Sequence, residues 1–145
     1  MKTHEANDET SIRALLGYLN ACHDGVVRRI SFIKDRDYTN EGDVFWPTGS
    51  EAWKYDMARC SIEMEILLNS YAGATPKQVV LLQFEAVCSF RFCQEDAFDY
   101  SFIYEIVLDN SGENGFEFLF RMGWAKQVEA LRVVCSKIVC VELGQ

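Results

Sequence analysis

Alternation of apolar and polar residues over positions 57–68 constrains the fold of this chain more than any other feature of its sequence. One parity is apolar and the other is largely polar: Ala58, Cys60, Ile62, Met64, Ile66 and Leu68 against Arg59, Ser61, Glu63 and Glu65. Successive side chains of a strand point to opposite faces, so this period of two predicts a strand with one dry and one wet face. Such half-buried strands are typical of antiparallel sheets.

Related patterns predict further strands along the chain. They cover residues 26–34, 79–93, 101–108, 115–122 and 131–143. The strand at 79–93 would span roughly 40 Å at about 3.3 Å per residue, so we expect it to curl or to contain a bulge. The polar residues 109–114 predict the turn of a hairpin between the two strands that flank them.

One amphipathic helix is expected before the strands, over residues 8–22. Its apolar stripe consists of Ile12, Leu15, Leu16, Leu19 and Cys22. Asn7 or Asp8 can cap its first turn, and Asp24-Gly25 can form the turn into the first strand, with the glycine taking a positive φ. The predicted fold is α+β and predominantly β: a single domain over 1–145, with one N-terminal helix packed on a curved antiparallel sheet of about six strands, barrel-like or sandwich.

Charge and hydropathy limit the possible partners. The net charge is -8 and the pI is about 4.7, which argues against nucleic acid and favours a basic protein partner. The first eleven residues have no apolar signal-peptide core, and no stretch reaches eighteen apolar residues. These features predict a cytoplasmic protein that does not enter membranes and whose six cysteines are reduced.

No spacing in the sequence favours catalysis, a metal or a cofactor. Cys22, His23 and Asp24 are contiguous, whereas the members of a catalytic triad come together from different elements. We expect His23 to donate to the last helix carbonyls instead. The acidic clusters at 41–43 and 95–99 lack the spacing of a calcium-binding loop. No catalytic residue and no metal ligand is therefore predicted.

The segment 35–56 shows no regular period and carries the predicted partner-binding site. Aromatic anchors with an acidic rim are typical of protein-binding surfaces, and this segment contains both: Trp46, Glu51, Trp53, Tyr55 and Asp56. The alternative interpretation is that these rings cover an open end of the sheet.

The run HDGVVRRI, from His23 to Ile30, resembles the HD-x-x-[IV]-x-x-I opening of small bacterial domains. Some of these domains are uncharacterised and others are assigned as immunity proteins of polymorphic toxin systems. The run LQFEAV at 82–87 is similar to a later strand of the same families. The resemblance covers only part of the chain, and the segment 35–56 departs from it. It implies a non-enzymatic binding protein.

Three hypotheses follow. The leading one is an immunity-like interaction protein that binds a basic partner through an acidic and aromatic surface. The alternative is a small-molecule-binding or catalytic β-barrel whose cavity is lined by Phe84, Phe90, Phe92, Phe118 and Phe120. The third is a homodimer through a sheet edge, because no predicted strand carries the proline or dense lysine that blunts such an edge.

Overall fold

The computed structural model describes residues 2–33, 41, 60–68, 78–93, 102–112, 115–123 and 127–144. Within these residues there are one α-helix, one 3-10 turn and nine strands. Their bounds are β1 (Lys2–Ala6), α1 (Glu9–Tyr18), η1 (Asn20–Cys22), β2 (Gly25–Ile33), β3 (Cys60–Leu68), β4 (Gln78–Val87), β5 (Ser89–Phe92), β6 (Phe102–Gly112), β7 (Gly115–Met122), β8 (Val128–Cys135) and β9 (Lys137–Gly144).

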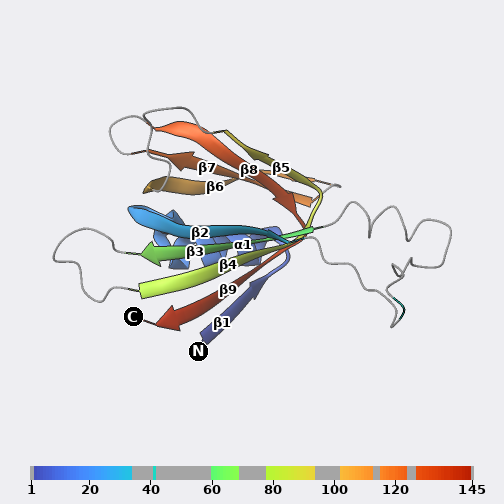
Figure 1. Cartoon of the computed structure of the whole chain (residues 1–145), viewed down its shortest axis with the longest axis horizontal. Helices are drawn as coiled ribbons and strands as arrows, with labels where there is room; N and C mark the ends of the chain where they lie inside the picture. The colour runs from blue at the N-terminus through green and yellow to red at the C-terminus, as the bar shows by residue number, and fades with distance from the viewer. Residues whose placement is uncertain are drawn as a thin grey trace.

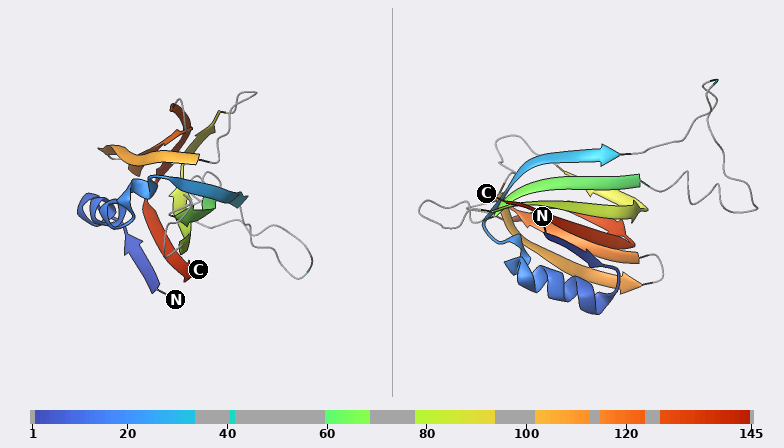
Figure 2. Two further views of the ribbon diagram at one scale, coloured as in Figure 1. Left: turned by 90° about the vertical axis from the view of Figure 1, so that its left-hand side faces the viewer. Right: turned by 90° about the horizontal axis from the view of Figure 1, so that it is seen from below.

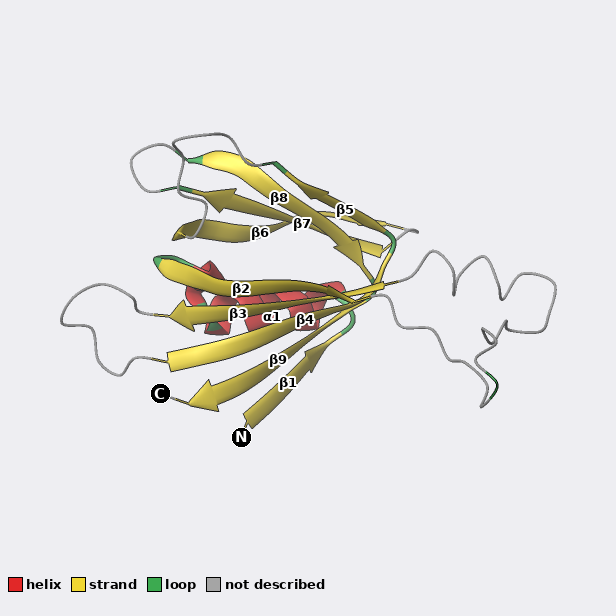
Figure 3. Cartoon of the chain, viewed as in Figure 1, coloured by secondary structure: helices red, strands yellow, loops and turns green. Residues whose placement is uncertain are grey.

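The strands form one open antiparallel sheet that is strongly bent. Their order is β1-β9-β4-β3-β2-β6-β7-β8-β5. The first five strands in this order, β1, β9, β4, β3 and β2, make one layer. The last four, β6, β7, β8 and β5, make a second layer (Figure 1). Among the residues that the structure describes, strands β2 and β6 are joined by two residue pairs, Gly25 with Ile103 and Val26 with Phe102. The predicted α+β class with a mostly antiparallel sheet is confirmed, and Figure 3 shows how little of the described chain is helical.

Two stretches of chain pass through both layers. Only Cys88 separates β4 from β5, and only Ser136 separates β8 from β9. Strand β4 pairs with β9, and β5 pairs with β8, so the two stretches stay side by side across the bend. The bend coincides with Ala86, whose φ is 54°. The curl or bulge expected within 79–93 is therefore confirmed, and the β3–β4 ladder also shifts register here, between the pairs Ile62–Phe84 and Cys60–Val87.

The predicted count of about six strands is wrong, since the sheet has nine. Two of the extra strands arise because 79–93 and 131–143 each divide at the bend. The third is β1, an edge strand that pairs only with β9. Of its residues only Ala6 is buried, so β1 lacks the apolar alternation on which the sequence prediction depended.

The helix is shorter than predicted. Asp8 is its N-cap and accepts a hydrogen bond from the Ser11 backbone N–H at 2.7 Å, while the Ser11 hydroxyl reaches back to the cap. The helix ends at Tyr18 instead of residue 22, because Asn20, Ala21 and Cys22 have φ values of 51°, 53° and 54°. These are left-handed conformations, which disfavour continuation of a right-handed helix.

Side chains from both layers and from α1 fill the space inside the bend. The rings of Phe118 and Phe120 lie 5.7 and 5.8 Å from that of Phe84, in edge-to-face arrangements. Ile12 and Leu15 of α1 are buried in the same core. The helix contacts both β1 and β6, and in Figure 2 it lies at the side of the molecule between these two strands.

Glycine has a required role at two turns. The hairpin predicted around 109–114 is confirmed, but its strands continue to a Gly112–Gly115 pair. A Cβ on Gly115, whose φ is 120°, would lie 2.6 Å from the Cys135 carbonyl oxygen. At the start of β2, Asp24 takes the positive φ that was expected of Gly25. Gly25 is needed for another reason, since a Cβ there would lie 2.8 Å from the Cys22 carbonyl oxygen.

No disulfide joins any of the six cysteines, all of which lie in the described part of the chain. Cys22, Cys135 and Cys140 are buried, whereas Cys88 and Cys93 are exposed. Cys135 and Cys140 are five residues apart, an odd spacing that would place their side chains on opposite faces of a single strand. Both are buried because the break at Ser136 places them in different strands. No helix in the described part of the chain is long and apolar enough to cross a membrane.

Candidate functional site

The predicted partner-binding residues lie outside the described residues. They are Trp46, Glu51, Trp53, Tyr55 and Asp56. The strands before and after them are described: Ile33 ends β2 and Cys60 begins β3. Ile33 is paired with Ser61 in the β2–β3 ladder, so the end of β2 and the start of β3 lie at neighbouring positions.

An exposed aromatic pair lies at this end of the sheet. Phe32 is 57% exposed and Phe90 is 36% exposed, and their ring centroids are 6.0 Å apart. They flank a shallow groove of about 350 Å³, called here the aromatic groove, lined by Phe32, Cys60, Val87, Cys88, Ser89 and Phe90. Phe32 is paired opposite buried Ile62, which places it on the core-facing side of β2. Its exposure could not be predicted, because a strand pattern gives the face and not what covers it.

The five phenylalanines proposed as the lining of one cavity do not surround a common space. Phe84, Phe118 and Phe120 are 0% exposed and pack against one another. Phe90 and Phe92 belong to edge strand β5 and are exposed. The first three therefore fill the interior instead of lining a ligand cavity there.

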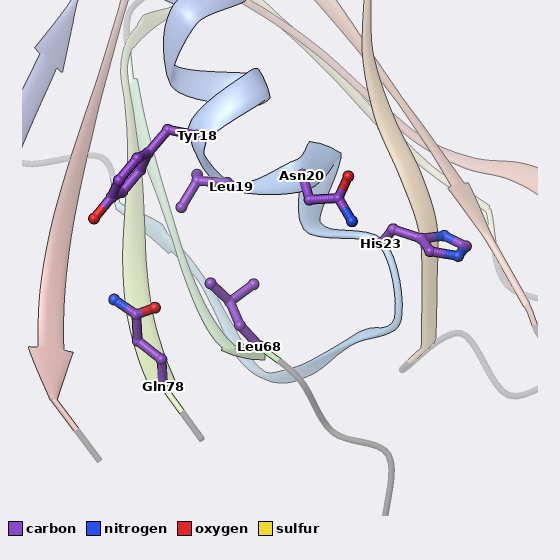
Figure 4. A pocket seen from close by; sticks show the side chains of 6 residues that line it. All are labelled: Tyr18, Leu19, Asn20, His23, Leu68 and Gln78. Carbon is purple, nitrogen blue, oxygen red and sulfur yellow. The ribbon is translucent and has the colours of Figure 1, made fainter. Parts of the chain in front are cut away.

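A second pocket lies where α1 ends, at the opposite end of β3. This helix-end pocket has a volume of about 260 Å³ and is lined by Tyr18, Leu19, Asn20, His23, Leu68 and Gln78. In Figure 4, Asn20 and Gln78 lie on opposite sides with Leu19 and Leu68 between them, and the His23 ring points away. Neither Asn20 nor Gln78 could be identified from the sequence, because each is an isolated amide outside any recognised motif.

A carboxylate behind this pocket is the hub of a polar cluster. Glu142 Oε1 accepts hydrogen bonds from the Tyr18 hydroxyl, at 2.9 Å, and from Gln78 Nε2. Glu142 Oε2 pairs with His4 Nε2 at 3.1 Å. Hydrogen bonds from His4 and Tyr18 lower the pKa of Glu142, and the bond to Glu142 raises the pKa of Tyr18. The cluster ties β1 and the end of α1 to β4 and β9.

Cys22, His23 and Asp24 do not converge into a catalytic arrangement. The Cys22 side chain is buried, and burial raises its thiol pKa to about 12. His23 Nδ1 lies 2.5 Å from the Tyr104 carbonyl oxygen, to which it must donate because a carbonyl only accepts. The expectation that the His23 ring donates to the last helix carbonyls is wrong, since its partner is on β6. His23 Nε2 and Asp24 Oδ2 are 3.6 Å apart.

The other buried thiols are equally poor nucleophiles. Burial raises the pKa of Cys135 to about 12 and that of Cys140 to about 11, so both are protonated at neutral pH. Among the described residues, no group of three or more His, Cys, Asp or Glu side chains is arranged to hold a metal ion.

Much of the charge on the described sheet is neutralised within the chain. Arg121 pairs with Glu105 at 2.7 Å, and Arg132 pairs with Glu117. Lys137 lies 3.4 Å from Glu5 and 3.8 Å from Glu85. Such cross-strand pairs are ordinary features of a solvated sheet face, so they do not mark a binding site.

Comparison of the chain with protein-family models, with characterised proteins and with solved structures gave no match. The two candidate sites are therefore interpreted from their own geometry.

Proposed function

We propose that this chain is a non-enzymatic, immunity-like interaction protein that binds a basic protein partner at the aromatic groove. The observation that carries the proposal is the exposed pair of Phe32 and Phe90, 57% and 36% exposed with rings 6.0 Å apart. A core-facing phenylalanine left this exposed costs solvation free energy that a partner would recover. Aromatic side chains that become buried on association are typical of the residues that dominate binding energy.

Charge supports a basic partner. The chain carries a net charge of -8, and a field of that sign accelerates encounter with a cationic protein. The segment between Ile33 and Cys60 contains Trp46, Glu51, Trp53, Tyr55 and Asp56. Because both attachment points flank the groove, the proposal includes these five residues as contributors to the same surface.

The test uses the purified product of the neighbouring gene as the first candidate partner. Its affinity is measured by calorimetry for the wild type, for Phe32→Ser with Phe90→Ser, and for the control Leu143→Ser. Leu143 is also an exposed apolar residue, at 39%, but it lies on β9 and not at the groove. We expect the double substitution to weaken binding by about 30-fold or more, the control to leave it unchanged, and binding to weaken with added salt.

Two results would contradict the proposal. One is an affinity that the groove substitutions leave unchanged while both variants keep the wild-type melting temperature. The other is the recovery of no partner, from either the neighbouring gene product or a wider affinity capture.

A further inference from the structure

We propose that the helix-end pocket binds the ammonium group of a lysine side chain presented by another protein. The inference shares with the proposed function only the expectation of a basic partner. Because the pocket lies at the opposite end of β3 from the aromatic groove, the two proposals can fail separately.

The shape of the pocket suits an aliphatic stem with a polar tip. Leu19 and Leu68 form an apolar floor and are 6% and 7% exposed, and the Tyr18 ring forms a wall. The volume of about 260 Å³ is enough for one long side chain and too small for most drug-sized ligands. Lysine places four methylene groups against such a surface while its charged end remains free to form hydrogen bonds.

Two hydrogen-bond acceptors lie across this floor. Gln78 donates its Nε2 to Glu142, which leaves its side-chain oxygen as an acceptor. The Asn20 side chain has no hydrogen-bond partner among the described residues, and it lies opposite Gln78 (Figure 4). An ammonium group has three donors and no acceptor, so an amide oxygen on either side of this floor can accept a hydrogen bond from it.

The electrostatic surroundings favour a cation. The carboxylate of Glu142 lies directly behind Gln78 and Tyr18. The carbonyl end of α1 also points here, and the last turn of α1 contains no basic residue to offset its negative dipole. None of the described residues that line the pocket is a lysine or an arginine. Tyr18 already accepts one ammonium group within the chain, with Lys2 Nζ 5.7 Å from the centroid of its ring.

The backbone that presents Asn20 is held in an unfavourable conformation. Asn20, Ala21 and Cys22 have φ values between 51° and 54°, and alanine and cysteine rarely adopt this region. Such conformations persist where the surrounding structure enforces them, and they concentrate at functional sites. Here they turn the chain so that Asn20 faces the pocket.

The turn also provides a matched pair of variants. Asn20→Gly removes the amide but keeps the left-handed backbone, which glycine accepts without strain. Ala21→Gly makes the same backbone change at the next residue, whose φ is 53° and which does not line the pocket. A difference between these two variants therefore reports the amide and not the flexibility of the turn.

The experiment is a titration followed by backbone amide NMR. The ligands are Nα-acetyl-lysine methylamide, its uncharged analogue Nα-acetyl-norleucine methylamide, and n-butylamine. We expect saturable shifts at Leu19, Asn20, Leu68 and Gln78 with the lysine compound, and no shift at Phe32. Asn20→Gly should weaken this binding by at least about tenfold, whereas Ala21→Gly should not.

Each alternative result overturns the proposal. Equal binding of norleucine would show an apolar slot without ammonium recognition. Equal binding of n-butylamine would assign the pocket to free amines instead of a protein side chain. Retained binding in Asn20→Gly, or no shifts with the lysine compound, would remove the pocket as an ammonium site.

Discussion

The two ends of strand β3 have different surroundings: a hydrogen-bonded polar cluster at one end and exposed aromatic rings at the other. Leu68, at one end, lies beside the helix-end pocket, where Glu142 accepts hydrogen bonds from several elements. Cys60, about 26 Å away at 3.3 Å per residue, lies beside the aromatic groove, where Phe32 and Phe90 are exposed. The alternation along β3 is the same at both ends. The difference therefore comes from the elements packed against the strand and not from the strand itself.

The largest expected effect comes from the core between the two ends. Phe84 is 0% exposed and contacts the rings of Phe118 and Phe120, which come from the other layer of the sheet. Phe84→Ala should lower the free energy of unfolding by about 3–5 kcal/mol, as measured by urea denaturation. Because this cluster joins the layers, we expect it to loosen both ends together. Hydrogen exchange that increased at only one end would contradict a shared core.

A comparison of one substitution at each end sharpens the contrast. Leu68 is 7% exposed, so Leu68→Ala should cost about 2–4 kcal/mol of stability. Phe32 is 57% exposed, so Phe32→Ala should change stability by about 0.5 kcal/mol or less. Equal losses for the two variants, measured by thermal and urea unfolding, would show that Phe32 is a packing residue and would undermine the proposed groove.

The β-rich fold could be predicted because its main signals are local. The alternation in β3, the cap at Asp8 and the hairpin before Gly115 each depend on residues close in sequence. The bends at Ala86 and Ser136 could not be located, because they depend on how two long stretches of chain pass between layers. Strand β1 was missed since its pairing with β9 joins opposite ends of the chain.

The candidate sites were less predictable than the fold. The aromatic groove combines Phe32 with Phe90, which are distant in sequence and share no pattern. The helix-end pocket combines the end of α1 with Gln78 and Leu68, again without a motif. The sequence did predict a partner-binding surface at Trp46, Trp53 and their neighbours, which lie outside the described residues and stay a prediction.

A smaller, stabilising effect is expected at the helix-end pocket. Ala21 has a φ of 53°, and a left-handed conformation costs a non-glycine residue roughly 1–2 kcal/mol. Ala21→Gly removes this cost, but glycine also increases the conformational entropy of the unfolded chain, which offsets part of the stabilisation. The substitution should therefore stabilise the fold by up to about 1 kcal/mol. The control is Ala14→Gly within α1, which should destabilise by about 1 kcal/mol. A destabilised Ala21→Gly would show that the turn is not strained.

The smallest expected effect concerns the pH dependence of the Glu142 cluster. Hydrogen bonds from His4, Tyr18 and Gln78 hold the pKa of Glu142 below its ordinary value of 4.5 in the folded protein. A carboxyl whose pKa is lowered by folding stabilises the native state above its unfolded pKa, and this contribution disappears as the pH falls through the folded value.

The test compares melting temperatures of the wild type and Glu142→Gln from neutral pH down to the acid limit of folding. Glu142→Gln should melt below the wild type at neutral pH, and the gap should close once the pH falls below 4.5. The control is Glu129→Gln, a change at a carboxylate that is 61% exposed and lies away from this cluster. A gap that stayed constant through this range would show that Glu142 acts through packing and not through its charge. The end of β3 at Leu68 would then be stabilised by apolar contacts. The two ends of β3 would differ only in how exposed their side chains are.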